Sequence, residues 1–535
     1  MPRSGPPSVR LPPPPHRGPV GATGLVLGLM LGAPTVAHAG GFEVPDRGAR
    51  ALGRGGANVV GAVDGTALHY NPGALAKQRG TRFTYNHALV WHDTRFTRAP
   101  ISFGDDAGTE FGEVRNDRSM FPLGLFAVLS TDFGLDNWTF GAGVYGPHSV
   151  GRHDYPEYGP QAFMLTDMNV LMVYYSLAAA WKWRDVFGIG VTAQYVDLMS
   201  LDYSLVIDST FTEGLDAVPD DASTQLTSTL KLRDRASGTA IVGLWYRPHR
   251  RVELGLAGRV VPVFLHAKGT METDKPTLVT DDVRISMPLT LPATVRGGLR
   301  YIHQTKDREW FDLELNAQWE GWSTIDAYEV SVDGQISGQE IGDLRLDKQW
   351  RDTVSVRLGG DVHVIPERLT LRAGGYFETA ATPEAYAHLD FPSFMRGGVG
   401  GGLTAGARGI YGTVGFLHVF QQQQQTDELT AKVFQQRPIR PCPDRCGGSS
   451  GVPANAGTFT SRYEILTLGI ELRFAELLGR RRDRKQAERE AERPAVPPTA
   501  PDVSGFDAQD YAAPTEPEPA ATEDDGGFGD FSGAR

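Results

Sequence analysis

The sequence predicts an all-β protein, a 14-stranded antiparallel transmembrane β-barrel with an N-terminal hatch that plugs its lumen. Three observations predict this fold. Fourteen short stretches alternate between apolar and polar residues, the connections between them are alternately very short and long, and a segment rich in small residues precedes the first stretch. Such alternation, with unequal loops on the two rims, is typical of outer-membrane barrels.

The ends of the fourteen expected strands are placed to within a few residues. In chain order the strands are 81–92, 118–130, 137–146, 165–182, 186–201, 228–246, 251–264, 282–303, 308–330, 349–364, 368–379, 394–406, 409–421 and 460–474. Tight turns that alternate with long loops are expected at 132–136, 184–185, 247–250, 304–307, 366–367 and 407–408. An even number of strands leaves both chain ends on the short-turn side.

The direction of the side chains follows from the cost of placing charge in lipid. An Arg that faces lipid at mid-bilayer costs about 2 to 4 kcal/mol, whereas an Arg in the lumen costs little. Arg372 is therefore expected to point inward, with Leu371 and Phe377 toward lipid. The same parity in three further strands predicts an inward set of Thr353, Ser355, Arg357, Gly359, Asp361, His363, Asp312, Glu314, Asn316, Gln318, Thr467, Glu471 and Arg473.

Aromatic residues favour this barrel over a soluble β-sandwich. A sandwich with one solvated face shows the same local period, but it lacks the regular difference in loop length and the aromatic residues at strand ends. Aromatic side chains near the strand ends are expected to form an interfacial girdle. They are Trp91, Trp138, Trp181, Trp183, Trp245, Tyr246, Tyr301, Trp310, Trp319, Trp322 and Phe474.

Residues 1–39 are expected to be a secretory signal peptide. Three Arg residues precede the apolar run 25–31, and small residues at 37–39 form a cleavage site. No other segment approaches the roughly 20 apolar residues that a helical span needs. The formal charge of −12 becomes about −15 when the three Arg residues leave with this segment, so nucleic-acid binding is disfavoured.

The rest of the chain divides into a hatch at 40–80, a barrel at 81–474 and a tail at 475–535. The hatch sequence is small, apolar and rich in turns, so it needs a container. The barrel lumen is the nearest one, because inward polar groups can satisfy irregular backbone there. A periplasmic linker is the alternative, although the apolar residues of the segment suit a linker poorly.

A series of motifs runs through the hatch and barrel in a fixed order, at 51–57, Asp64, 70–73, 139–147, 291–294, 319–323, 351–353 and 371–376. In this order, behind a signal peptide, they resemble the FadL-like family of outer-membrane transporters of long-chain fatty acids and aromatic hydrocarbons. Gly73 departs from the family pattern, which has Ala after Asn-Pro. The resemblance implies a hatch-plugged barrel that captures a hydrophobic ligand from outside and releases it sideways into the membrane, without an energy source.

The hatch supplies the first candidate site residues, which are Phe42, Asn71, Pro72 and Gly73. Asn71 and Pro72 form a fixed turn, because Pro holds φ and the Asn side chain can bond backbone groups. With the resemblance, this pattern predicts that Phe42 lies near the ligand pocket. It also predicts that residues 71–73 touch the barrel wall near the third strand.

In the family that this chain resembles, the lateral opening lies at a kink in the third strand. Here Gly141, Gly143, Gly146 and Pro147 are concentrated in that strand. Pro cannot donate to a strand ladder, and Gly allows a bulge. The alternative is that these residues only mark the exit of the strand into the loop 147–163.

A carboxylate ligand would need a cation in the lumen. The strand phases make Arg296, Arg300, Arg357 and Arg372 the candidates. Acidic residues share the inward faces, so we expect most of these Arg residues to belong to a salt-bridge network that fills the barrel. The acidic residues are Asp312, Glu314, Asp361 and Glu471.

Catalytic and metal chemistry is not predicted. Ser355 and His363 are the nearest nucleophile and base, but eight residues separate them by about 27 Å along a strand. Cys442 and Cys446 stand in a loop without nearby His, and this spacing in an exported protein predicts a local disulfide.

The sequence therefore predicts a passive, non-enzymatic outer-membrane transporter of hydrophobic compounds, with a general diffusion porin or a structural barrel as alternatives. The expected partners are a hydrophobic small-molecule ligand, outer-membrane lipids and the barrel-assembly machinery, with no cofactor and no nucleic acid. Residues 475–535 are expected to form a largely disordered periplasmic tail. From Pro494 onward this tail has nine acidic residues and one basic residue among Pro, Ala and Gly, too little apolar surface to fold.

Overall fold

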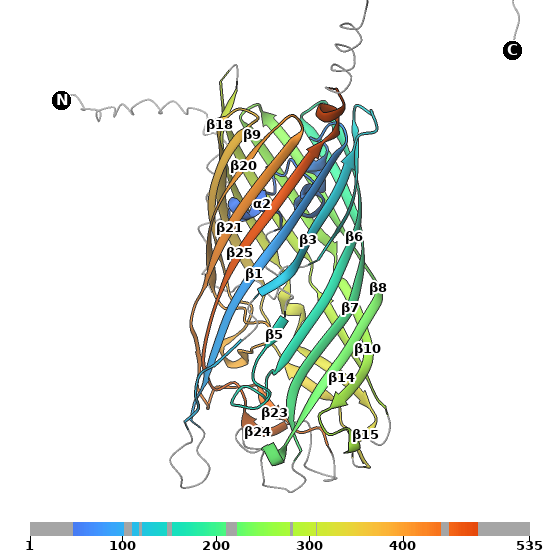
Figure 1. Ribbon diagram of the computed structural model, residues 1–535, viewed down its shortest axis with the longest axis vertical. Helices are drawn as coiled ribbons and strands as arrows, with labels where there is room; N and C mark the ends of the chain where they lie inside the picture. Colours follow the sequence, from blue (N-terminus) through green and yellow to red (C-terminus); the bar gives the residue numbers. More distant parts are fainter. Residues whose placement is uncertain are drawn as a thin grey trace, which may run out of the picture. The chain divides into compact units, whose positions relative to one another are not determined.

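The computed structural model describes residues 47–100, 110–116, 120–146, 152–209, 222–278, 282–305, 308–336, 338–439 and 449–479. Strands tilted around a common axis form the wall of a barrel (Figure 1). The wall strands are β1 (Arg82–Arg98), β3 (Met120–Thr131), β4 (Trp138–Tyr145), β6 (Asp167–Trp183), β7 (Phe187–Asp208), β8 (Gln225–His249), β9 with β10 (Val252–Val261, Val263–Thr273), β11 with β12 (Val283–Leu291, Thr294–Gln304), β13 with β14 (Glu309–Glu320, Ala327–Asp333), β18 (Thr353–Ile365), β19 (Leu369–Glu378), β20 (Arg396–Ala407), β21 (Ile410–Gln421) and β25 (Gly457–Arg473).

These segments make 14 antiparallel wall strands, which confirms the predicted fold class. Each strand pairs with the next, and β25 closes the ring on β1 from Arg82↔Arg473 to Arg98↔Gly457. Pro262 separates β9 from β10, and Pro292 follows β11, because Pro has no backbone N–H for the ladder. The short turns after β6, β18 and β20 place Arg184, Glu367 and Arg408 at φ 54°, 57° and 63°.

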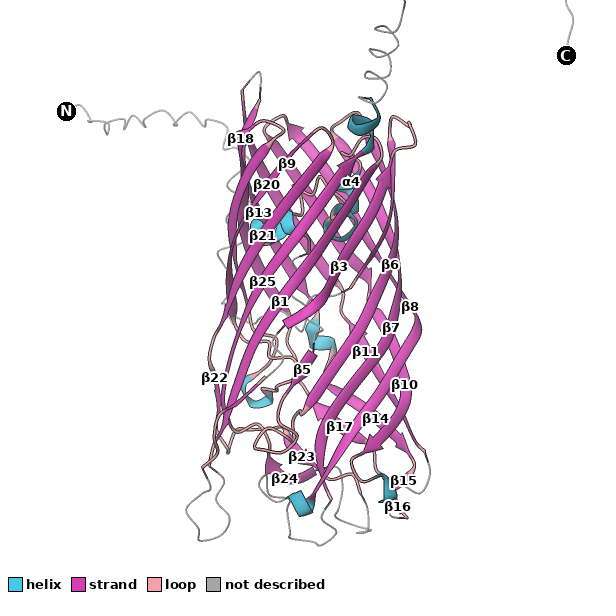
Figure 2. Ribbon diagram, in the orientation of Figure 1, coloured by secondary structure: helices cyan, strands magenta, loops and turns pink. Residues whose placement is uncertain are grey.

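The remaining described elements belong to the hatch and to the long loops. Three short helices lie inside the short-turn half of the barrel, at the top of Figure 2. None of the helices in the described ranges is long and apolar enough to cross a membrane. These elements are α2 (Ala49–Gly53), α3 (Ala67–Tyr70), α4 (Pro72–Leu75), β2 (Val114–Arg115), β5 (Arg152–Asp154), η1 (Ala222–Thr224), η2 (Pro276–Leu278), η3 (Trp322–Thr324), β15 (Gln335–Ile336), β16 (Gln339–Glu340), β17 (Leu344–Asp347), η4 (Glu384–Tyr386), β22 (Gln424–Thr426), β23 (Phe434–Gln436) and β24 (Ser449–Pro453).

The burial of alternate residues confirms the predicted phase of the strands. Arg357 is 2% exposed and the adjacent Leu358 is 54% exposed, while Arg372 is 7% and Leu371 45% exposed. Two residues of the predicted girdle are placed differently. Trp245 and Trp322 are both 2% exposed and lie inside. The ring of Trp245 packs against Lys77 of the hatch, and the indole N–H of Trp322 donates to a Glu320 carboxylate oxygen.

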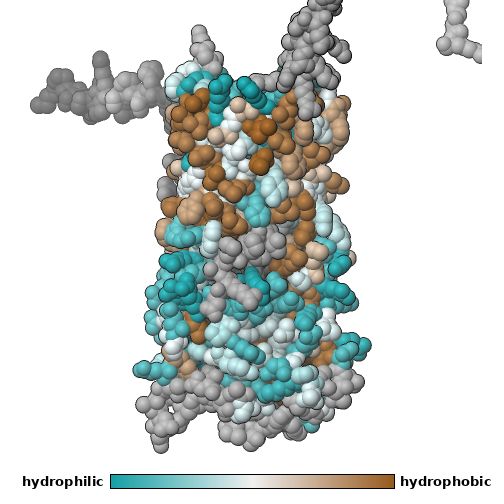
Figure 3. All heavy atoms as spheres, viewed as in Figure 1, coloured by the Kyte–Doolittle hydropathy of each residue, from teal (hydrophilic) through white to brown (hydrophobic). Residues whose placement is uncertain are grey.

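The apolar outer surface covers only the short-turn half of the face seen in Figure 3. The other half of this face is mostly hydrophilic. Transmembrane barrel strands need about 9–11 residues, whereas β7 has 22 residues and β8 has 25. The barrel wall therefore continues well past the hydrocarbon layer on the long-loop side.

Candidate functional site

The hatch, of which residues 47–80 are described, is held in the lumen by an ion-pair cluster around Arg54. The Arg54 guanidinium lies 2.8 Å from Asp312, 3.0 Å from Glu314 and 2.7 Å from Asp361. Arg50 adds a second contact to Asp361 at 3.0 Å. Arg54 is fully buried, so these carboxylates are what make its burial tolerable.

Backbone groups of the hatch also bond the wall. The backbone N–H groups of Val60 and Gly61 donate to the two carboxylate oxygens of Glu314, at 2.7 and 2.8 Å. Val59 N–H donates to the Asn316 side chain at 3.2 Å. Inward polar groups thus satisfy irregular backbone, as the sequence predicted for a segment housed in the lumen.

Asn71, Pro72 and Gly73 form the predicted turn and begin α4. Asn71 caps this helix by accepting from Gly73 N–H at 3.0 Å, and Pro72 stands at its first position. Asn71 also donates to the Leu244 carbonyl at 2.9 Å. A Cβ at Gly243 would lie 2.2 Å from Asn71 Oδ1, so the close approach requires glycine there.

The turn therefore lies against the wall at β7 and β8, the fifth and sixth wall strands, rather than near the third as expected. The third wall strand contacts the preceding helix instead. A Cβ at Gly141 would lie 2.8 Å from the Leu68 side chain, and a Cβ at Gly143 would lie 3.4 Å from it. These two inward glycines give room to Leu68.

The third wall strand, β4, is short, and it ends at Tyr145. It pairs with β3 only from Phe126 and with β6 only from Tyr174 toward the short turns. Beyond it, β5 pairs with residues 167–169 of β6. Among the described residues, Val170–Val173 of β6 therefore have a strand partner only on the β7 side. Gly146 lies at this point and accepts a hydrogen bond from Arg47 at 2.9 Å.

The four candidate cations bind groups of the protein. Arg296 of the wall donates to the backbone carbonyl of His69, a hatch residue, at 3.0 Å. The other three each bond a buried wall carboxylate. The pairs are Arg300 with Asp312 at 2.8 Å, Arg357 with Glu378 at 3.1 Å, and Arg372 with Asp361 at 3.3 Å. For Arg300, Arg357 and Arg372 this arrangement is the salt-bridge network that the sequence predicted for most of these residues.

Several predicted residues lie outside the described ranges. They are Phe42, Pro147, Cys442 and Cys446, together with the signal peptide 1–39 and the tail from residue 480 onward.

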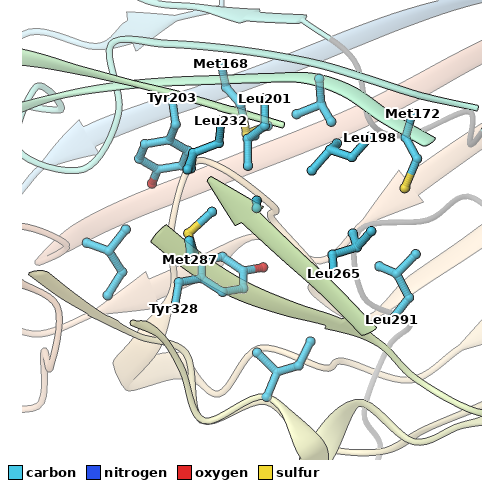
Figure 4. Packing of buried hydrophobic residues seen from close by; sticks show 14 of the residues in the cluster. Met168, Met172, Leu198, Leu201, Tyr203, Leu232, Leu265, Met287, Leu291 and Tyr328 are labelled. Carbon is cyan, nitrogen blue, oxygen red and sulfur yellow. The ribbon is translucent and has the colours of Figure 1, made fainter. Parts of the chain in front are cut away.

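An apolar pocket with a cavity volume of about 50 Å³ lies in the long-loop half of the barrel. Figure 4 shows side chains from several wall strands converging on it. The lining residues are Val170, Met172, Leu198, Leu201, Tyr203, Leu230, Leu265, Met287, Leu289, Thr290, Leu291, Ile325, Tyr328, Leu346 and Phe391.

This pocket was not predicted from the sequence. The available signal was strand length, because β6, β7 and β8 carry apolar inward residues beyond the span that a membrane requires. Two bulges in the β7–β8 register, between Val196 and Leu201, hide the period of two at this point.

A buried charge cluster adjoins the pocket through its Tyr residues. Lys348 Nζ lies 2.6 Å from an Asp390 oxygen, and both side chains are completely buried. The Tyr203 hydroxyl donates to the same carboxylate at 3.4 Å. Burial opposes the charge of Asp390, but His388 and Lys348 hold the pKa of its carboxyl well below the usual range.

At the short-turn end, a polar cavity between the hatch and the short turns is lined by residues of both charge signs. Among the described residues, Glu309, Asp312 and His363 bring ligand atoms within 4.8 Å of one another. Arg300 bonds both carboxylates at 2.8 Å, so its guanidinium already supplies the positive charge of this cluster. The donor set therefore fits an ion-pair network better than a metal centre.

The sequence matches the family described as outer membrane protein transport protein (OMPP1/FadL/TodX) over residues 30–436. The comparison with curated proteins finds no match.

Solved structures share the fold at low identity. A FadL homologue from Pseudomonas aeruginosa has a TM-score of 0.64 and 17% identity, covering 81% of this chain and 100% of its own. The toluene transporter TbuX from Ralstonia pickettii has a TM-score of 0.53 and 13% identity, and the match covers 80% of this chain and 99% of TbuX. The toluene transporter TodX from P. putida has a TM-score of 0.53 and 15% identity, and the match covers 78% of this chain and 98% of TodX. With the closed 14-strand barrel and the family match over most of its length, the chain belongs to the OMPP1/FadL/TodX family of outer-membrane transport proteins.

Proposed function

We propose that this protein carries hydrophobic compounds passively across the outer membrane, by capture from outside in the apolar pocket and lateral release through the wall beside β4. One observation carries the proposal. Val170 and Met172 line the pocket and also belong to the stretch of β6 that has no described strand partner on its β4 side. The pocket thus adjoins the part of the wall where β4 ends.

Partitioning supplies the driving force of this route. Each buried CH₂ group is worth about 0.8 kcal/mol, so a lipid or hydrocarbon gains little from a watery pore and much from an apolar path. The ligand class of the proposal includes fatty acids, other lipids and hydrocarbons. Membership of a transporter family supports it, and two structural relatives are named as toluene transporters.

A general diffusion porin is the main alternative. The hatch argues against it, because a porin has no use for a segment that buries Arg54 among three wall carboxylates in the lumen. A purely structural barrel has no use for an apolar cavity lined by uncharged side chains either. The proposal involves no chemical conversion of the ligand.

Lateral release is tested by placing a larger side chain in the pocket at Met172, beside the end of β4. We expect Met172→Trp to reduce cellular uptake of a labelled hydrocarbon to the level of cells without the protein, while heat-modifiable gel mobility stays normal. Leu177→Trp is the matched control, since Leu177 is 69% exposed on the outer face of the same strand. Normal uptake by a folded Met172→Trp variant would contradict the proposal.

A further inference from the structure

The chemistry at the edge of the apolar pocket restricts the charge of the ligand. The charged group adjoining it is the Lys348–Asp390 pair, whose closest atoms are 2.6 Å apart and completely buried. Asp390 also accepts from the Phe391 backbone N–H at 2.7 Å. Each charge is therefore already neutralised by the protein.

His388 adds no charge to this cluster at alkaline pH. Its ring lies 2.8 Å from the second Asp390 oxygen. Burial lowers the pKa of His388 below its usual value of 6.5, in spite of the adjacent carboxylate, so the ring is neutral at pH 8. Among the described lining residues of the pocket, none carries a charge. A ligand carboxylate would be buried there without a free cation, which is strongly unfavourable.

The pocket does contain neutral hydrogen-bonding groups. The Tyr203 hydroxyl is used by the protein, since it donates to the Met164 carbonyl at 3.3 Å and to Asp390. The Tyr328 hydroxyl makes no hydrogen bond to the described part of the chain. In Figure 4 its oxygen points into the pocket, toward Leu265. This hydroxyl is placed to bond one polar atom of a ligand that is otherwise surrounded by apolar side chains.

We propose that the pocket selects uncharged hydrocarbon ligands that carry one neutral polar group, such as a hydroxyl or carbonyl, read by Tyr328, and that the Lys348–Asp390 pair excludes free carboxylates. This inference rests on the proposed function, because it names the ligand class of the same pocket. Tyr328 acts as a specificity residue that touches the ligand. Asp390 acts through Lys348, by keeping that ammonium group neutralised.

The test uses saturation binding of radiolabelled 1-dodecanol, dodecane and dodecanoate to the full chain in lipid nanodiscs at pH 8, with empty nanodiscs subtracted. We expect dodecanol to bind at least about tenfold more tightly than dodecanoate. Tyr328→Phe should weaken dodecanol binding by about three- to tenfold, as expected for one lost hydrogen bond, and leave dodecane unchanged. Tyr386→Phe is the control, since Tyr386 lies in the neighbouring loop and outside the pocket lining.

A second variant gives a gain that misfolding cannot imitate. Asp390→Asn removes the carboxylate with little change of shape and frees Lys348, so dodecanoate binding should become tighter. The double variant Asp390→Asn with Lys348→Met should lose that gain. Dodecanoate binding as tight as dodecanol in the native chain, or no gain in a folded Asp390→Asn variant, would overturn the ligand class while leaving transport intact. If none of the three compounds binds saturably, the pocket is not a ligand site and the proposed function fails with the inference.

Discussion

The two halves of the lumen differ in the side chains that face inward. In the short-turn half, inward charges meet the hatch, and Arg54 alone contacts three wall carboxylates within 3.0 Å. In the long-loop half, apolar side chains from several wall strands and loops line a pocket of about 50 Å³, beside the buried Lys348–Asp390 pair. The first half is filled by the hatch and held by paired charge, while the second leaves an apolar cavity. The two halves of one barrel therefore differ both in what their inward positions carry and in the polarity of their outer surface.

The largest effect is expected from deleting the hatch, which fills the short-turn half of the lumen. Deleting residues 47–75 takes away the Arg54 contacts and all three hatch helices. We expect a nearly silent channel to become a conducting one in planar bilayers, because the remaining inward groups are charged and wettable. Deleting residues 480–535 is the control and should change neither conductance nor uptake. Unchanged conductance after the hatch deletion would show that the hatch is not the seal.

A smaller effect, a loss of unfolding stability, is expected when only the Arg54 ion pairs are removed. Arg54→Met leaves Asp312, Glu314 and Asp361 without their shared cation, and breaking such a buried pair costs about 3–5 kcal/mol. Urea unfolding followed by heat-modifiable mobility measures this loss. Arg345→Met is the control, because Arg345 also pairs with two acids but is half exposed, so its loss should leave stability nearly unchanged. Equal effects of the two variants would remove the distinction between a locked and a solvated charge.

The glycines of β4 test the boundary between the two halves. Gly141→Val would place a methyl group into Leu68, and such overpacking costs about 1–3 kcal/mol. We expect Leu68→Ala in the same chain to restore both unfolding stability and uptake. If uptake stays low in the stable double variant, Gly141 belongs to the release path rather than to the seat of the hatch.

The smallest effect is expected outside the lumen. A disulfide between Cys442 and Cys446 would close a very small loop and contribute about 2 kcal/mol of local chain-entropy benefit, with no influence on the barrel. Mass spectrometry of unreduced peptides decides whether the bond exists. Two free thiols in the exported protein would refute it.

The inward direction of Arg357, Arg372 and Asp361 was predicted correctly, whereas their partners were not. The direction of a side chain depends on neighbouring residues, because period two and the local cost of charge in lipid fix it. The partner depends on closure of the ring, since Arg54 meets Asp312 and Asp361 across 258 and 307 residues of chain. For the same reason Gly141 was assigned to a lateral opening from the family resemblance and the local glycine pattern, and its closeness to Leu68 could not be foreseen.

By itself, the sequence determined the strand number, the alternation of short turns and long loops, the phase of four strands, and the expectation that the small, apolar hatch segment is housed in the lumen. Each of these depends on residues close together in the chain, and on a lipid solvent that penalises misplaced charge. Only the tertiary structure decided which groups the lumen Arg residues pair with, that the Asn71 turn lies against β7 and β8, and that segments from β6 to the loop after β19 enclose one apolar pocket. These features depend on register and shear around the whole ring, which bring distant side chains to the same height in the lumen.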